Sequence, residues 1–159
     1  MEKKKYEHDF SMKSLIVLFS YHHNNTEKIA KTMAKVLNAE IKMPEQINPG
    51  ELQDYDLIGF GSGIYGGRHH KSLLKLSDKL SKVPDGNAFI FSTSGATGKS
   101  KTAKDHYALR EKLQLKGYLI IDEFQCKGKL FGLINRSRPN TEDMKLAEEF
   151  AQNVSEQVF

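Results

Sequence analysis

The sequence has little that would cross-link the chain or carry it into a membrane. It contains one cysteine, Cys126, which excludes an internal disulfide framework and cannot by itself form a metal site. No apolar run approaches the roughly 20 residues that cross a bilayer. The basic residues 3–5 are followed by polar residues 7–9, where a signal peptide would need its apolar segment. We therefore expect a cytoplasmic protein with no membrane span.

A large charge of one sign is also absent. The 24 basic and 20 acidic residues leave a net charge of +4, with a sequence pI near 9.0. This surplus is too small to indicate a nucleic-acid binder, so we expect no nucleic-acid partner. It is typical of a solvated, lysine-rich surface, and it leaves open an acidic protein partner or an anionic ligand.

Apolar strands alternate with amphipathic helices along most of the 159 residues. Residues 1–13 are polar and without clear periodicity, so we expect a flexible N-terminal tail before one domain spanning 14–159. Expected strands are 15–20, 39–43, 56–61, 88–92 and 118–124. Expected helices are 26–37, one through Leu73–Leu80, 100–116, and a last one capped by Asn140 or Thr141. This order predicts a doubly wound α/β fold, with a five-stranded parallel sheet of order 2-1-3-4-5 and helices on both faces.

In such a fold, ligands bind beyond the carboxyl ends of the strands, where the strand order reverses. The loops after the first, third and fourth strands should therefore meet. The first of them follows an apolar strand and ends on Thr26, a residue suited to capping the next helix. A helix N-terminus favours anions, and a loop without lysine suits a phosphate monoester. The candidate residues here are Ser20, His22, His23, Asn24, Asn25 and Thr26, and a solvent-facing histidine pair stays equally open.

The second and third loops are rich in small residues. Glycines at 61, 63, 66 and 67 would let the backbone approach a flat ligand, and Tyr65 among them could stack on an aromatic ring. Arg68, His69 and His70 follow at the expected start of the third helix, either facing a negative ring or solvated. The candidates are Ser62, Gly63, Ile64, Tyr65 and Gly66 in the second loop, and Ser92, Thr93, Ser94 and Gly95 in the third.

Three other phosphate or nucleophile motifs do not fit. The Gly98-Lys99-Ser100 segment lacks the earlier glycine of a triphosphate-binding loop, since Thr93 stands there. A phospho-acceptor domain needs acids after the first strand and an aspartate ending the third, and this chain has neither. A nucleophile elbow around Ser62 would need glycine two residues to either side.

With these loops in place, the sequence resembles the flavodoxin-like family of FMN proteins, in its short-chain form. The resemblance runs from Ser14 to about Val154 and rests mainly on residues 15–30 and 56–65. It implies non-covalent FMN as cofactor and electron transfer as function. It places the FMN phosphate at Ser20, Asn25 and Thr26, and the two sides of the flavin ring at residues 63–65 and 92–95.

The sequence departs from the family pattern in three ways. The first loop is one residue longer, and neither tryptophan nor an aromatic residue in 93–98 is present to cover the second face of a flavin. The chain is also basic, whereas electron-carrier flavodoxins are typically acidic. Positive charge from residues 68–70 near the ring would stabilise a reduced, anionic flavin, so we expect a higher reduction potential than such carriers have.

The sequence thus predicts a flavoprotein that transfers electrons to a redox protein or a small acceptor. One alternative is an FMN-dependent NAD(P)H or quinone reductase, which an open flavin face and a basic rim would favour. A second alternative is a cofactor-free protein-binding module on the same fold. Whether the chain is an enzyme, and its oligomeric state, stay open at this point.

Overall fold

A computed structural model describes residues 12–20, 25–128 and 137–158 of the chain. The strands are β1 (Ser14–Phe19), β2 (Glu40–Lys42), β3 (Leu57–Tyr65), β4 (Arg68–His69), β5 (Gly86–Ser94) and β6 (Tyr118–Lys127). The helices are α2 (Asn25–Leu37), α3 (Lys71–Lys79), α4 (Lys99–Leu115) and α5 (Thr141–Val158), with short 3-10 turns at Pro44–Gln46 and Pro49–Asp54.

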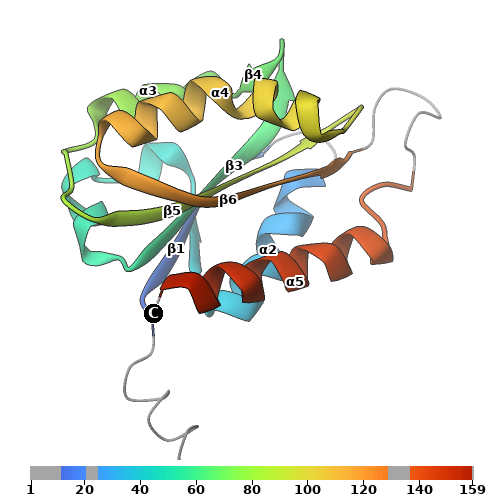
Figure 1. The fold of residues 1–159 in the computed structure, drawn as a ribbon, viewed down its shortest axis with the longest axis horizontal. Helices are drawn as coiled ribbons and strands as arrows, with labels where there is room; N and C mark the ends of the chain where they lie inside the picture. The colour runs from blue at the N-terminus through green and yellow to red at the C-terminus, as the bar shows by residue number, and fades with distance from the viewer. Residues whose placement is uncertain (1–11, 21–24, 129–136, 159) are drawn as a thin grey trace, which may run out of the picture.

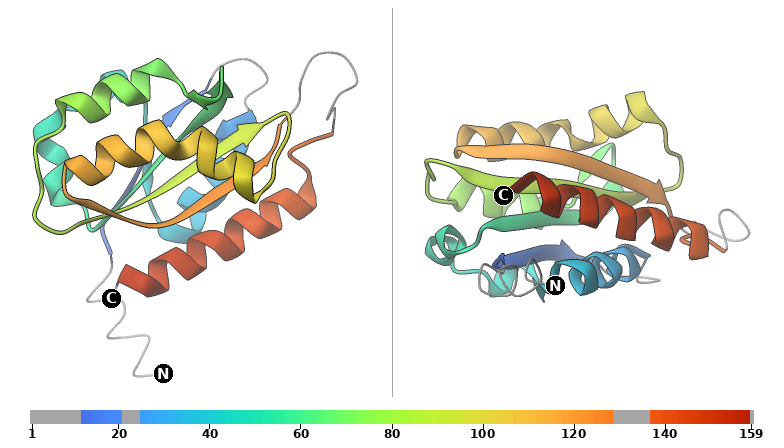
Figure 2. Two further views of the ribbon diagram at one scale, coloured as in Figure 1. Left: turned by 45° about the horizontal axis from the view of Figure 1, so that its top comes forward. Right: turned by 60° about the horizontal axis from the view of Figure 1, so that its bottom comes forward.

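The predicted topology is confirmed. Strands β2-β1-β3-β5-β6 are parallel neighbours in that order, and two-residue β4 is added antiparallel to β3. Helices α3 and α4 cover one face of the sheet and α2 and α5 the other (Figure 1; Figure 2). Residues of β1 alternate between the two layers, because successive side chains of a strand point to opposite faces: Leu15 and Val17 pack on the α3/α4 side, and Ile16 and Leu18 on the α2/α5 side.

Strand β3 is longer than its sequence predicts. The expected loop from Gly61 begins only after Tyr65, since Ser62 and Gly63 still pair with Ser92 and Thr93 of β5. Gly61 lies in the strand under a phenyl ring, where an added Cβ would come within 2.3 Å of Phe91. This glycine therefore serves packing between two strands.

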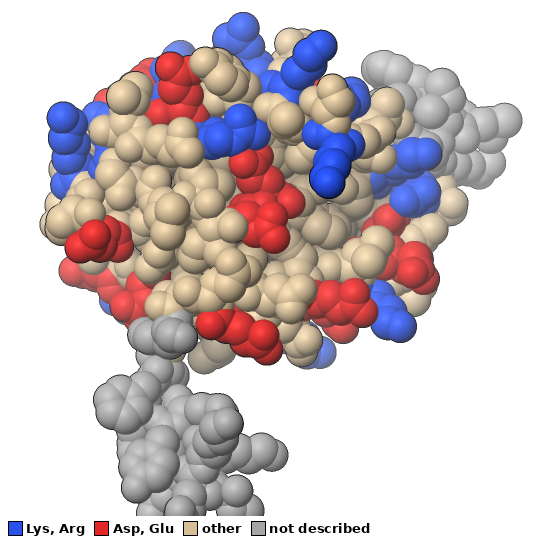
Figure 3. Space-filling view, in the orientation of Figure 1, with Lys and Arg blue, Asp and Glu red and all other residues tan. Residues whose placement is uncertain are grey.

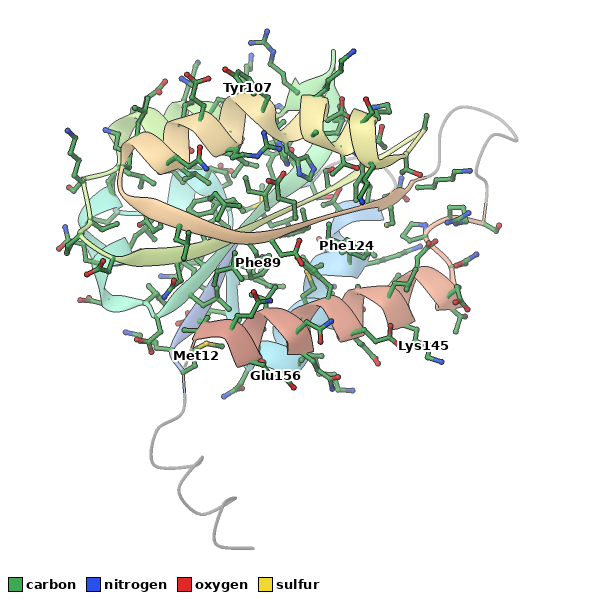
Figure 4. The ribbon with its side chains drawn as sticks, in the orientation of Figure 1. Met12, Phe89, Tyr107, Phe124, Lys145 and Glu156 are labelled. Carbon is green, nitrogen blue, oxygen red and sulfur yellow. The ribbon has the colours of Figure 1, made fainter. Side chains whose placement is uncertain are left out.

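An aromatic cluster joins the sheet to α5. Phe89 of β5 and Phe124 of β6 both contact Phe150, with ring centroids 5.7 and 5.4 Å away (Figure 4). The helix itself begins with reciprocal capping: Asn140 accepts from the amide of Asp143 at 3.0 Å, and the Asp143 carboxylate accepts from the amide of Asn140 at 2.8 Å. Of the two predicted caps, the structure selects Asn140.

The N-terminal boundary of the domain is held by hydrogen bonding. The backbone amide of Lys13 donates to the Asp56 carboxylate at 2.8 Å, so Lys13 belongs to the fold, while residues 1–11 of the predicted tail are not among the described residues. None of the helices in the described ranges has the length and apolar character to cross a membrane.

Candidate functional site

The ends of three parallel strands meet at one edge of the sheet. The Thr26 hydroxyl at the start of α2 is hydrogen-bonded to that of Thr93 at the end of β5, with 2.8 Å between the oxygens. The amide of Gly128, just after β6, donates to the Ser94 carbonyl at 2.9 Å. A Cβ on Gly128 would lie 3.0 Å from the Asn25 amide nitrogen, so the first and third predicted loops are packed together here.

The first loop is described in part. Helix α2 begins at Asn25, so Thr26 lies inside its first turn and not at the cap position that we expected. Ser20 follows β1 at the same end of the sheet, and the amides of the first turn of α2 face this edge. His22, His23 and Asn24 lie outside the described residues, so their assignment stays a prediction.

The second loop is a hairpin between β3 and β4. Gly66 and Gly67 form its turn at φ values of 60° and 79°, which L-residues rarely adopt. Tyr65 is 37% exposed and meets His70 edge to face, with centroids 5.3 Å apart, while Phe19 stacks on the same imidazole at 3.6 Å. Ile64 lies half-buried next to Tyr65.

Buried Ser62 holds this hairpin to α3. Its hydroxyl donates to the Gly63 carbonyl at 2.6 Å and accepts from the His70 amide at 3.0 Å. His70 is the N-cap of α3, where its Nδ1 accepts from the Ser72 amide at 3.1 Å. The side chain of Ser62 thus already has partners within the protein, and its role in ligand binding stays a prediction.

The expectation of positive charge from His69 and His70 is wrong. His69 belongs to β4 and not to the helix start, and it is 1% exposed, with Nε2 3.0 Å from the Phe91 carbonyl. Burial, reinforced by nearby His106, lowers the pKa of His69 to about 3. Burial and then Lys71 also lower the pKa of His70. Both imidazoles are therefore neutral at pH 7, and only Arg68 of the three supplies charge.

The third loop is anchored by side chains from α4. The Ser92 hydroxyl is fully buried and lies 2.7 Å from His106 Nε2, and Gln125 Nε2 donates to it at 3.0 Å. Lys101 Nζ donates to the Ser94 hydroxyl at 3.1 Å. Gly95 is half-buried, and the residues from Ala96 onward are exposed as the chain continues to α4. The backbone of Ser94 and Gly95 thus remains at the sheet edge, whereas Ser92 faces inward.

A partly buried polar network that the sequence analysis missed lies behind this loop. We call it the α4 network; its members are Ser92, Ser94, Lys101, Asp105, His106, Arg110, Glu123 and Gln125. The Glu123 carboxylate accepts from His106 Nδ1 at 2.9 Å and from Arg110 at 2.6 and 2.8 Å. The Asp105 carboxylate accepts from Gln125 at 3.0 Å and from Lys101.

The direction of the hydrogen bonds in the α4 network follows from the groups that can only donate or only accept. The Glu123 carboxylate can only accept, so His106 Nδ1 donates to it, and the Nε2 of a neutral imidazole then accepts from the Ser92 hydroxyl. The amide nitrogen of Gln125 can only donate, so Ser92 accepts from it. Burial opposes the charge on Glu123, but the hydrogen bonds from Arg110 and His106 prevail and lower its pKa to about 2.

Ser92, His106 and Glu123 have the order of an acyl-transfer triad but not its accessibility. A nucleophilic serine must reach its substrate, and the Ser92 side chain has no exposed surface. The arrangement therefore positions the loop after β5. One sequence signal pointed to it: His106 shares the apolar face of α4 with Leu109 and Leu113, at helical spacing.

Cys126 and Arg138 are both held within the fold. Cys126 is buried, and this burial, with Asp143 adding to it, raises the pKa of its thiol to about 12, in agreement with a structural role. Arg138 of the basic segment 127–138 pairs with Asp143 at 2.6 Å, while residues 129–136 lie outside the described residues. Within the described ranges, no three His, Cys, Asp or Glu side chains are grouped so that they could hold a metal ion.

The chain matches a family model, a sequence relative and several solved structures. The family model of the flavodoxin domain matches residues 16–137. An uncharacterized protein of Methanocaldococcus jannaschii is 50% identical over 150 residues, which is 90% of this chain and 98% of that protein. The crystal structure of oxidised flavodoxin 2 from Bacillus cereus superposes with a TM-score of 0.72 at 22% identity, covering 91% of this chain and 99% of that one. A short-chain flavodoxin associated with a PDU bacterial microcompartment gives 0.71 at 13% identity, covering 93% and 100%.

Proposed function

This chain belongs to the flavodoxin domain family, and we propose that it binds FMN at the carboxyl edge of its sheet and transfers electrons through it. One observation carries the proposal: the start of α2, the β3–β4 hairpin and the loop after β5 lie at the same edge of the sheet, with Thr26 and Thr93 hydrogen-bonded across it. That edge is where doubly wound folds bind their ligands.

The donors at the start of α2 fit a phosphate monoester. The first-turn amides of a helix have no partner inside it and carry the positive end of the helix dipole. The side chains of Asn25 and Thr26 at the same place are neutral, the Thr26 hydroxyl being hydrogen-bonded to Thr93, and no lysine stands in Ser20–Thr26. Neutral donors of this kind suit the doubly charged phosphate of FMN without a metal ion.

The two other loops fit the edges of a flat ring. Tyr65 is exposed at the end of β3, and the glycine turn that follows lets the hairpin project beyond the sheet. Opposite it, Ser94 and Gly95 present small side chains and backbone. We propose that Gly63, Ile64, Tyr65 and Gly66 border one side of the flavin, and Thr93, Ser94 and Gly95 the other.

The cofactor supplies the redox chemistry when bound, and the protein positions and tunes it. Neutral His69 and His70 add no positive charge, so the electrostatic influence of the protein at the ring would come from Arg68 and more distant lysines. The α4 network holds the loop at Ser94 in place, which reduces the ordering that cofactor binding would otherwise require.

A paired substitution tests the phosphate end. Replacing Asn25 and Thr26 by alanine should weaken FMN binding about 10- to 100-fold, since roughly 1.4 to 2.8 kcal/mol of hydrogen bonding is lost. Riboflavin, which lacks the phosphate, should bind nearly unchanged. Thr32→Ala is the control, because its hydroxyl donates to the Lys28 carbonyl farther along the same helix. Equal losses for both ligands would contradict the assignment, and no quenching of FMN fluorescence by the wild type would reject the cofactor.

A reductase is the second candidate, favoured by one feature. The loop from Ser94 to Gly98 has no aromatic side chain to cover a flavin, and hydride transfer requires such an open face. Mixing the FMN-loaded protein with NADPH under anaerobic conditions separates the two functions. Bleaching of the flavin absorbance within seconds would indicate a reductase, and an unchanged spectrum a carrier that needs a protein donor.

A further inference from the structure

The carboxyl edge of the sheet carries unbalanced positive charge. Arg68, Lys99, Lys104 and Lys127, which we call the basic rim, have no ion-pair partner among the residues that the structure describes. Arg68, Lys99 and Lys104 are exposed and Lys127 is half-buried. These cations therefore set the electrostatic potential of this edge.

The acids at the same edge do not cancel the basic rim. Asp105 and Asp143 are buried, and each is already bound by its own cation, Lys101 and Arg138. At the opposite edge Lys112 is paired with Asp78 at 2.6 Å. The cations of the basic rim, by contrast, keep their charge without a neutralising ion pair in the described part of the chain.

The rim is formed by three segments. Strand β4, which carries Arg68, packs on α4, which carries Lys99 and Lys104, with His69 of β4 against His106 of α4. Lys127 ends β6 opposite Ser94, directly beside the loop into α4. In the space-filling view of Figure 3, blue side chains gather at the upper right over β4 and the start of α4, and red ones along α5 below.

We propose that the basic rim docks an acidic redox protein, and this rests on the proposed FMN site, which the rim borders. A redox partner must bring its centre close to the flavin, and complementary charge would steer and orient that encounter. The patch is small, since Glu111 follows on α4 and exposed Glu142 begins α5. Small, polar contact areas are typical of transient redox complexes, whereas duplex DNA needs a longer row of cations.

Two matched charge reversals test the surface. The probe is a plant-type [2Fe–2S] ferredoxin, which is acidic, titrated by calorimetry into the full chain with and without saturating FMN. The double variant Lys99→Glu/Lys104→Glu should weaken binding at least about 10-fold at low salt, and wild-type binding should weaken about 10-fold between 50 and 300 mM salt. The control, Lys79→Glu/Lys82→Glu, changes the net charge equally at the far end of α3 and should stay within about twofold.

Each outcome decides a separate point. Equal losses for the two double variants, or no ferredoxin binding at all, would overturn the docking surface. Tighter binding of a 20-base-pair DNA duplex than of ferredoxin in the same buffer, lost in the Lys99→Glu/Lys104→Glu variant, would reassign the rim to nucleic acid. If ferredoxin binds the rim but FMN does not bind the chain, the proposed function fails while the docking surface stands.

Discussion

The two faces of the sheet are stabilised differently near its carboxyl edge. On the α2/α5 face the packing is apolar through Ile16, Leu18, Phe89, Phe91 and Phe150, and it ends in a single pair of threonines, Thr26 and Thr93. On the α3/α4 face the apolar layer of Leu15, Val17 and Ile90 gives way at the same level to His69, Ser92, His106 and Gln125. Phe91 and Ser92 are sequence neighbours that point to opposite faces, so one strand supplies both environments.

The difference shows that one fold can tolerate substitutions on one face of its sheet and fix the position of side chains on the other. Apolar packing is non-directional and accepts any arrangement of similar volume. A network whose donors and acceptors all match permits one arrangement only, and it fixes the loop beside the candidate site. Four measurements test this difference between the two faces.

The largest effect is expected on the apolar face. Phe91→Ala removes a fully buried ring that covers Gly61, and it should lower the free energy of unfolding by about 3–5 kcal/mol. Urea titration followed by circular dichroism measures this loss. The milder Ile90→Val on the other face should cost about 0.5–1.5 kcal/mol. A loss below that of Ile90→Val would show that Phe91 is not a main core residue.

A smaller loss is expected on the polar face. His106→Leu leaves the buried Ser92 hydroxyl proton without an acceptor, and it should cost about 2–3 kcal/mol by the same measurement. Adding Ser92→Ala removes that orphaned group, so the double variant should be less destabilised than the sum of the two single variants. Simple additivity within about 0.5 kcal/mol would mean that the two side chains are not coupled.

The two faces should also differ in their response to acid. The folded pKa of His69, about 3, lies below the ordinary value near 6.5, so the unfolded chain binds a proton that the fold rejects. Stability should therefore fall as the pH drops from 6.5 toward 3, by up to about 1.4 kcal/mol per pH unit. Glu123, with a folded pKa of about 2, adds a loss below pH 4.5.

Replacing His69 tests its share of this loss of stability in acid. Urea titrations at pH 6.5, 5.5 and 4.5 should show a flatter dependence for His69→Gln than for the wild type. Phe91→Ala serves as control, because its unfolding free energy should be lower at every pH with an unchanged slope. Parallel curves for His69→Gln and the wild type would show that His69 is not kept neutral by the fold.

The smallest effect is expected on β6, the outermost strand of the sheet. Leu119 on β6 is 66% exposed, so Leu119→Ala should change stability by no more than about 0.5 kcal/mol. A loss above about 1.5 kcal/mol would indicate that Leu119 is covered in solution, for instance by a second copy of the chain. Size-exclusion chromatography of the same variant would then check the oligomeric state.

Much of the architecture could be predicted because it rests on local patterns. The apolar run at residues 15–20 and the amphipathic spacing of residues 26–37 predict a buried strand and its crossover helix, and the strand order follows from the handedness of such units. Strand ends were less predictable. Residues 62–65 read as a loop, yet they continue β3 because Ser62 and Gly63 pair with Ser92 and Thr93 of the next strand.

The location of the candidate site was predicted, but the contacts of the side chains packed behind its loops were not. The polar loop, the glycine hairpin and the small-residue loop were recognisable in the sequence, and their meeting follows from topology. The role of His106 was not predicted, because its partners Ser92 and Glu123 lie 14 and 17 residues away in the sequence. His69 reads as a basic residue beside the site, and its burial, which the sequence does not show, lowers its pKa to about 3.

The alternation of strands and helices, the parallel sheet order and the edge at which a ligand would bind thus follow from the sequence alone, since each depends on periodicity and chain connectivity. Which polar side chains face that edge, and which are enclosed, follows only from the folded structure. Burial and hydrogen-bond partners come from residues distant in the sequence, and they set both the charge of His69 and the orientation of Ser92. The concentration of unpaired cations at the basic rim has the same origin, because the acids nearest to it are bound inside the fold.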